Sequence, residues 1–171
     1  MFKEMIASQQ LNERSMDSWF DSVARTFGAN RLDEAETFVL DLSNGSPTMA
    51  EHRALARMWG TNGRFERAIE LQREAISRAP EEPAFLLGML RRELAGYHAA
   101  LGQWAEAAEA YEGALQALPN DVLMRNNLAF ILAEELNDAA SALPHAQKAA
   151  ELSPNDANVI GTESRTSAPV R

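Results

Sequence analysis

Four prolines recur along the chain at nearly even intervals: Pro47, Pro80, Pro119 and Pro154. The spacings between them are 33, 39 and 35 residues. Upstream of each proline lies the same pattern, which is an alanine-rich stretch of helical periodicity, a turn with glycine or asparagine, and a second such stretch. A period in this range is typical of stacked helix–turn–helix units. The sequence therefore predicts an all-α protein made of repeated helix pairs.

The segment between Pro47 and Pro80 shows the pattern most clearly. The residues of its second half that share one helical face are Phe65, Ala68, Ile69, Gln72, Ala75 and Ile76. Gly63 can adopt the left-handed conformation that ends a helix and lets the chain reverse. Pro80 cannot continue the second helix and disfavours helical geometry at Ala79. Each unit is thus predicted to be two antiparallel helices, each with one buried face.

Applied along the whole chain, this register predicts one domain of about four repeats between two less regular ends. The four repeats are expected at residues 16–48, 49–87, 88–121 and 122–157. Residues 1–15 are expected to form a leading helix. Residues 158–171 are expected to start a further helix, which breaks at Gly161 and is followed by a disordered tail.

Three local departures from the regular pattern are expected. Pro83 suits the first position of a helix, which would then reach Ala100 and be longer than its neighbours. Pro144 is tolerated if Ser141 caps a late helix start, because the proline then lies in the first turn. An extra residue in the range 135–137 predicts an altered turn. The regular capping signal of the fourth unit is the pair Asn120 and Asp121.

These residues together resemble the tetratricopeptide repeat family, and the resemblance covers about residues 16–157. The second unit has the family's apolar, small, aromatic and proline positions at Leu55, Ala56, Trp59, Ala68, Ala75 and Pro80. The third unit has them at Leu94, Ala95, His98, Ala107, Tyr111, Ala114 and Pro119. Residues 126–130 are similar to a common bacterial form of the first helix. The resemblance implies a right-handed α-solenoid and a non-catalytic scaffold that binds a partner peptide or helix in its concave groove.

In this family the concave groove is lined by the first helix of each unit. Carried onto this chain, the groove positions are Phe20, Arg53, Arg57, Met89, Arg92, Leu123, Asn126 and Phe130. Arginine binds carboxylates through two parallel hydrogen bonds. The resemblance therefore implies a partner with an acidic segment or a free C-terminal carboxylate. The alternative is that these arginines only balance nearby glutamates such as Glu51 and Glu93, because exposed ion pairs are common and weak.

Composition limits the classes of partner. The formal net charge is −9 and the pI is about 4.8. An acidic chain is a poor candidate for nucleic-acid binding, which depends on clustered lysine and arginine. The longest apolar run falls far short of a membrane span, and the first residues lack the apolar core of a secretory signal. A cytoplasmic protein is expected, with a trimmed leader or a periplasmic location left open.

The sequence carries no signature of catalysis. There is no cysteine, phosphate-binding glycine loop, zinc-protease motif or nucleophile motif. The three histidines fall in three different repeats, so no shared metal site is expected. We therefore predict no catalytic residues, cofactor or metal. Two alternatives to a peptide-binding scaffold remain: self-association through the uncapped C-terminal repeat or the N-terminal helix, and a regulatory or targeting domain of a larger enzyme.

Overall fold

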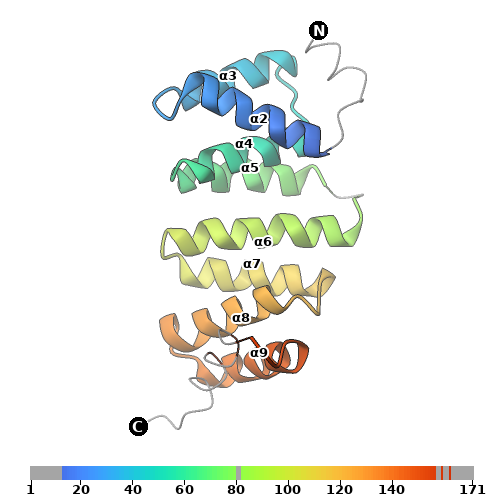
Figure 1. Cartoon of the computed structure of the whole chain (residues 1–171), viewed down its shortest axis with the longest axis vertical. Helices are drawn as coiled ribbons and strands as arrows, with labels where there is room; N and C mark the ends of the chain where they lie inside the picture. Colours follow the sequence, from blue (N-terminus) through green and yellow to red (C-terminus); the bar gives the residue numbers. More distant parts are fainter. Residues whose placement is uncertain (1–12, 80–81, 157–158, 160–161, 163–171) are drawn as a thin grey trace. The chain divides into compact units, whose positions relative to one another are not determined.

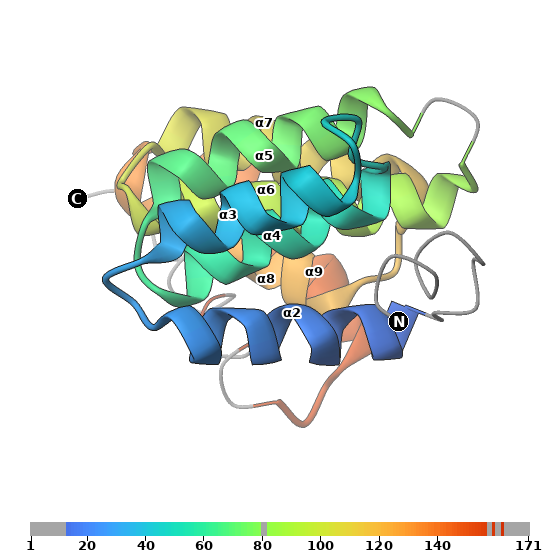
Figure 2. The ribbon, with the colours of Figure 1, turned by 90° about the horizontal axis from the view of Figure 1, so that it is seen from above.

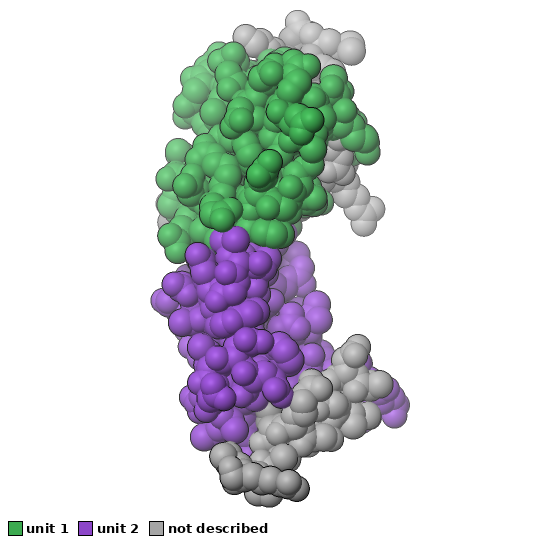
Figure 3. Space-filling model, turned by 90° about the vertical axis from the view of Figure 1, so that its left-hand side faces the viewer, with its two compact units in different colours: residues 1–80 green, residues 81–171 purple. Residues whose placement is uncertain are grey.

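The computed structural model describes residues 13–79 and 82–156 together with residues 159 and 162 (Figure 1). It divides into two compact units, residues 1–80 and residues 81–171 (Figure 3). Within the described part every regular element is helical. Each unit is built from two antiparallel helix pairs, whose members lie side by side (Figure 1, Figure 2).

The first unit contains four helices. They are α2 (Glu13–Phe27), α3 (Leu32–Leu42), α4 (Met49–Thr61) and α5 (Phe65–Ser77). Helix α2 packs against α3 and α4, and α4 packs against α5. Helix α4 begins with a capping box, in which the Thr48 side chain accepts from the Glu51 backbone N–H and the Glu51 carboxylate accepts from the Thr48 backbone N–H. Gly63 has a φ of 73°, which is the left-handed conformation expected at this turn.

The second unit contains two longer helices followed by a broken pair. The elements are α6 (Ala84–Ala100), α7 (Trp104–Ala117), α8 (Val122–Phe130), the π-helical segment η1 (Ile131–Glu135) and α9 (Ala139–Leu152). Helix α6 packs against α7, α7 against α8, and α8 against α9. Asp121 caps α8, as the sequence predicts, because its carboxylate accepts from the Met124 backbone N–H at 2.8 Å.

The ends of the chain differ from the expectation. Helix α2 begins at Glu13, so residues 13–15 belong to the first helix of the first pair. Residues 1–12, where the rest of the leading helix was expected, lie outside the described residues. At the other end, Val159 and Thr162 are helical and buried. Gly161, where the break was expected, and residues 163–171 of the predicted tail lie outside the described residues.

The turn around residues 135–137 is altered, in a way that the sequence did not define. Helix α8 continues directly into η1, where the Leu136 backbone N–H donates to the Ile131 carbonyl oxygen five residues earlier. The Asp138 backbone N–H then donates to the Leu132 carbonyl oxygen, and Asn137 has a φ of 55°. The extra residue is thus absorbed by a π-helical turn.

The predicted capping role of Ser141 is wrong. Helix α9 begins at Ala139 and is capped by Asp138, whose carboxylate accepts from the Ser141 backbone N–H at 3.0 Å. A hydrogen bond from the Ser141 hydroxyl, together with this backbone hydrogen bond, lowers the pKa of Asp138. Pro144 consequently lies inside the helix, five residues after its start. An aspartate cap stabilises the early start, because it satisfies N–H groups of the first turn.

Buried alanines occupy the contact between the two helices of a pair. Those with no exposed surface in the second helices are Ala35, Ala68, Ala75, Ala107, Ala114, Ala142, Ala146 and Ala149. At Gly88 of α6 the absence of a side chain lets the backbone of α6 come close to α7. A Cβ atom added there would lie 3.0 Å from the Ala117 Cβ and 3.2 Å from the Ala114 carbonyl oxygen of α7. The sequence register therefore places small side chains where the backbones approach each other.

The first unit also contains a buried charged group that joins three helices. Glu36 of α3 is only 6% exposed. Its carboxylate accepts a hydrogen bond of 2.7 Å from the Trp59 indole N–H of α4, and it forms a two-pronged ion pair with Arg67 of α5. Arg67 is also hydrogen-bonded to Glu70. A buried carboxylate that accepts several hydrogen bonds is satisfied, so this group links α3, α4 and α5 rather than weakening them.

The two glycines of α6 provide a matched test of the helix contact. Gly88→Ala should lower the free energy of unfolding by about 1 kcal/mol, because the new methyl group collides with α7 and overpacks the contact. Gly96→Ala should raise it by up to about 1 kcal/mol, because the space beside Gly96 is open and alanine favours the helix. Urea unfolding followed by circular dichroism measures both. Equal effects of the two substitutions would contradict this packing.

Glu36→Gln should lower the free energy of unfolding by about 1–3 kcal/mol, because the amide cannot accept both prongs of the Arg67 guanidinium. Arg67 is 42% exposed, so water partly solvates the released charge and limits the loss. Glu34→Gln on the same helix is the control. Its pair with Arg31 is exposed, so thermal unfolding should barely change. A silent Glu36→Gln variant would show that the buried pair does not hold these helices.

Candidate functional site

The groove positions predicted on the first unit lie on α2 and α4. On α4 the residues that are not buried form a single stripe, which contains Met49, Ala50, Arg53, Arg57 and Thr61. The two arginines lie one turn apart in the middle of this stripe and are half-buried. Phe20 of α2 is instead 2% exposed and packs edge-on against Trp19, with ring centroids 4.9 Å apart. Phe20 therefore contributes to the core of this unit.

The groove positions predicted on the second unit lie on α6 and α8. Three of them, Leu123, Asn126 and Phe130, share one face of α8 at the i, i+3, i+7 spacing. Leu123 is 60% exposed and Phe130 is 38% exposed. Leu123 and Phe130 thus place two exposed large apolar side chains on one helix face, and contiguous exposed apolar patches can mark interaction sites.

Helix α6 contributes Met89 and Arg92, which are both half-buried. The Arg92 guanidinium lies 3.8 Å from the carboxylate of Asp121, the cap of α8. This ion pair brings the middle of α6 close to the first turn of α8. Five of the predicted groove residues thus lie on two neighbouring helices of one unit.

The neighbouring asparagines of α8 have different roles. The Asn127 side-chain N–H donates to the Tyr111 hydroxyl of α7 at 3.2 Å, so this amide supports the core. The side-chain oxygen of Asn126 is buried and has no hydrogen-bond partner within the described residues. Buried polar atoms are normally paired. Asn126 therefore has an unused acceptor beside the exposed Leu123 and Phe130.

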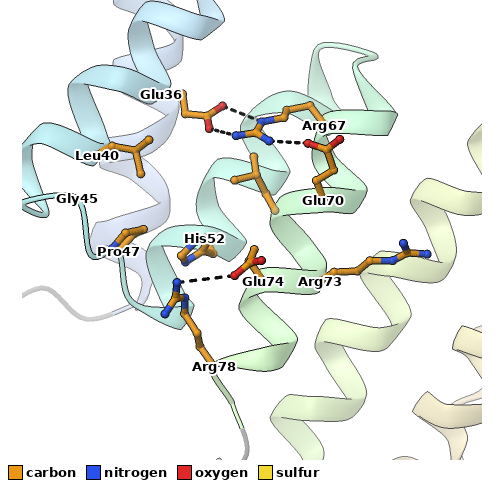
Figure 4. A pocket seen from close by; sticks show the side chains of 11 residues that line it. Glu36, Leu40, Gly45, Pro47, His52, Arg67, Glu70, Arg73, Glu74 and Arg78 are labelled. Atoms are coloured by element: carbon orange, nitrogen blue, oxygen red, sulfur yellow. Dashed lines mark hydrogen bonds and ion pairs between the residues drawn. The ribbon is translucent and has the colours of Figure 1, made fainter.

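Sequence reasoning missed a hollow of about 600 Å³ in the first unit. Its walls come from α3, the loop before α4, the first turn of α4, and α5 (Figure 4). The residues that line it are Glu36, Leu40, Gly45, Pro47, His52, Arg67, Glu70, Leu71, Arg73, Glu74 and Arg78. We call this the α3–α5 hollow.

The electrostatics of the α3–α5 hollow depend on Arg67. Its hydrogen bond to Glu36 raises the pKa of the Arg67 guanidinium, so this group stays charged. On the other side of the hollow, Glu74 and Arg78 form a longer pair of 3.7 Å (Figure 4). One sequence signal could have indicated the charged wall: Glu36 lies on the same face of α3 as the apolar Leu32, Ala35 and Val39.

Among the described residues, no helix is long and apolar enough to cross a membrane. Among the same residues, no three histidine, aspartate or glutamate side chains are grouped in a way that could hold a metal ion.

Comparison with known proteins supports the repeat interpretation. A family model described as tetratricopeptide repeat matches residues 89–131, which include most of α6 and all of α7 and α8. A search of curated proteins finds no significant match. The family match thus lies within the second unit, on the helices that carry Met89, Arg92, Leu123, Asn126 and Phe130.

Several solved structures share the fold at low sequence identity. The protein named in "MamA MSR-1 C2" has a TM-score of 0.65 and 18% identity over 88% of this chain and 84% of its own. A Podosopora anserina putative kinesin light chain with nearly identical TPR-like repeats has a TM-score of 0.64 and 15% identity, over 91% of this chain and 85% of its own. A chain of the APC/C hetero-tetramer Cut9–Hcn1 has a TM-score of 0.67 and 13% identity. This match covers 81% of the present chain but only 27% of the chain from the Cut9–Hcn1 complex.

The fold is therefore an all-α helical-repeat solenoid, which confirms the predicted fold class. Residues 89–131 match the tetratricopeptide repeat family, and the whole helix-pair fold is similar to solved structures with such repeats.

Proposed function

We propose that the protein is a non-catalytic protein–protein interaction scaffold, which binds a segment of a partner protein on the open faces of the first helices of its repeats. The observation that carries this proposal is the α8 face, where Leu123 is 60% exposed and Phe130 is 38% exposed. Apolar side chains anchor partner segments by leaving water on binding. Tetratricopeptide repeats generally act as such scaffolds.

The polar groups beside these side chains support a bound polypeptide. The Asn126 side-chain oxygen is buried and lacks a partner within the described part of the chain, so a rotation of this side chain would be needed for it to accept from a backbone N–H of a bound segment. Arg92 lies beside the same face and already pairs with Asp121. A partner here thus meets two apolar side chains, one acceptor and one guanidinium. This mixture suits an amphipathic segment.

The open stripe of α4 supports an acidic element in the partner. Its central side chains, Arg53 and Arg57, are spaced one turn apart and are half-buried. Two guanidinium groups at this spacing suit a carboxylate or an acidic run. We therefore include an acidic segment or a C-terminal carboxylate in the proposed partner.

The apolar anchor can be tested by affinity capture from a lysate of the source organism, with mass spectrometry of the bound proteins. Leu123→Ser combined with Phe130→Ser should reduce capture of the specific partner at least about tenfold, because both anchors are lost. Leu152→Ser is the control, because Leu152 is 37% exposed at the end of α9 and lies outside the proposed surface. Equal capture by all three proteins would contradict the proposal, provided that circular dichroism shows normal folding.

The arginine stripe can be tested by the salt dependence of the same capture. Arg53→Gln combined with Arg57→Gln should weaken capture at low salt and flatten its salt dependence, because fewer charges face the acidic segment. Arg64→Gln serves as the control, since Arg64 is exposed at the start of α5. Unchanged capture at all salt concentrations would exclude an acidic partner element on α4.

A further inference from the structure

We propose that residues 2–9, which precede α2 in the sequence, form a short helix that packs on an open aromatic face of the first helix pair. We call residues 2–9 the leading segment. The aromatic face consists of Trp19 and Phe27 of α2 and Phe38 of α3. This contact joins two parts of one chain and uses none of the residues of α4 and α8 that carry the proposed scaffold. It therefore goes beyond the proposed function.

The aromatic face lies on the side of α3 that points away from the next helix pair. Phe38 follows Glu36 by two residues, so the two side chains point about 200° apart around the helix axis. Glu36 bonds to Trp59 of α4 and to Arg67 of α5. Phe38 consequently points away from α4 and α5, and it is 42% exposed.

Three partly exposed rings make this face one apolar patch. The Phe38 ring centroid lies 6.5 Å from that of Trp19 and 5.8 Å from that of Phe27. Trp19 and Phe27 are half-buried, and the Arg31 guanidinium lies over the Phe27 ring at one end of the patch. Contiguous exposed apolar patches can mark interaction sites. Among the described residues no helix pair is stacked before α2 and α3, and stacked repeats need a covering element at such a face.

The leading segment has the pattern of a helix with one apolar side. Phe2, Met5 and Ile6 lie at the i, i+3, i+4 spacing that places side chains on one side of a helix. Glu4 and Ala7 fall on the opposite side. The segment contains no glycine or proline, so no residue in it interrupts a helix. A helix this short is marginal in water by itself, so it needs a surface to pack on.

The residues between the leading segment and α2 favour a reversal of the chain. Asn12 suits the N-cap position of a helix that begins at Glu13. Leu11 then precedes the cap and Met16 is the fourth helical residue, which is the spacing of a hydrophobic staple. A staple fixes the direction in which the chain enters a helix, and a short connection makes successive helices antiparallel neighbours. The leading segment thus folds back along α2.

The lengths of the two helices agree with contact to the aromatic face. From Glu13 to Trp19, α2 rises about 9 Å, at about 1.5 Å per residue. A helix formed by residues 2–9 spans about 12 Å, so its start lies level with Trp19 or just beyond it. Phe38 lies beside Trp19. The apolar side of the leading segment therefore reaches both rings.

Charge favours one orientation of the leading segment. Asp41 lies one turn after Phe38 on the same side of α3, and it is exposed. It forms no ion pair with another described side chain. Lys3 borders the apolar side of the leading segment. Because α3 runs antiparallel to α2, Asp41 lies level with the first half of α2, where the start of the leading segment arrives. A pair between Lys3 and Asp41 thus fits the antiparallel arrangement, and as an exposed pair it adds little strength.

The experiment is NMR of the full chain with isotope-labelled methionine and isoleucine methyl groups. We expect nuclear Overhauser cross-peaks from the Met5 and Ile6 methyl groups to the rings of Trp19 and Phe38. These cross-peaks require distances of a few ångströms, so they report the contact directly. A mixture of labelled and unlabelled chains separates contacts within one molecule from contacts between two molecules.

Phe2→Ser combined with Ile6→Ser removes most of the apolar side of the leading segment. This variant should lose the Met5 cross-peaks, because the segment no longer packs on the aromatic face. The indole N–H signal of Trp19 should shift as its ring becomes more exposed. The indole signal of Trp59 should stay in place, because Trp59 is bonded within the core of the unit. This difference distinguishes loss of the contact from unfolding.

The matched control is Glu4→Ser combined with Ala7→Ser, which changes the opposite side of the leading segment to the same extent. This variant should keep the Met5 and Ile6 cross-peaks. Loss of the cross-peaks in both double variants would mean that the apolar side does not make the contact, and the proposal would fail.

Two further results would overturn the proposal. The absence of cross-peaks from Met5 and Ile6 to either ring in the unsubstituted chain would leave the aromatic face without this occupant. Cross-peaks found only between labelled and unlabelled chains would make a second copy the occupant. The variant Leu123→Ser/Phe130→Ser should keep the cross-peaks, so failure of the scaffold proposal can be told apart from failure of this one.

Discussion

The close contact between the two helices of each pair is the constraint on which the rest of the structure depends. Alanines with no exposed surface lie at this contact, with Ala68 and Ala75 in one pair and Ala107 and Ala114 in another. A methyl group lets two backbones approach, whereas a larger side chain would hold them apart. Because the contact fixes which face of each helix is inside, it also fixes which residues remain outside. The proposed scaffold surface is drawn from those outer positions.

The periodic part of this arrangement could be predicted from the sequence. Turn glycines such as Gly63, the cap at Asp121 and the alternation of helices depend on neighbours within one turn of the chain, so the local pattern carries them. The first helix pair departs from this pattern at one position. It has Leu42 where other pairs have alanine, and Leu42 is half-buried at the last residue of α3. A helix end has room for the larger side chain, so the pair tolerates the departure.

Other features depend on contacts between distant segments and could not be predicted. Asp138 and Ser141 are both acceptable caps by composition, and the choice between them follows from the π-helical turn before α9. The position of Glu36 on the apolar face of α3 indicates burial, but its partners Trp59 and Arg67 lie 23 and 31 residues away and could not be predicted. The α3–α5 hollow has the same origin, because its lining comes from three helices and a loop. The predicted groove residues were assigned from the repeat positions of the family that the sequence resembles. The structure shows which of these residues are exposed.

Glu36 both joins three helices of the first unit and lines the α3–α5 hollow. Its carboxylate holds α3 against α4 and α5 through Trp59 and Arg67, and it also supplies one of the three negative charges of the α3–α5 hollow. If an apolar residue stood there, Arg67 would keep only its ion pair with Glu70, and the Trp59 indole N–H would lose its acceptor. The helix contact could in principle be satisfied by apolar packing, since buried ion pairs are often replaceable without loss of stability. The charged solution differs in that one carboxylate fixes the orientation of both Trp59 and Arg67 through directional hydrogen bonds.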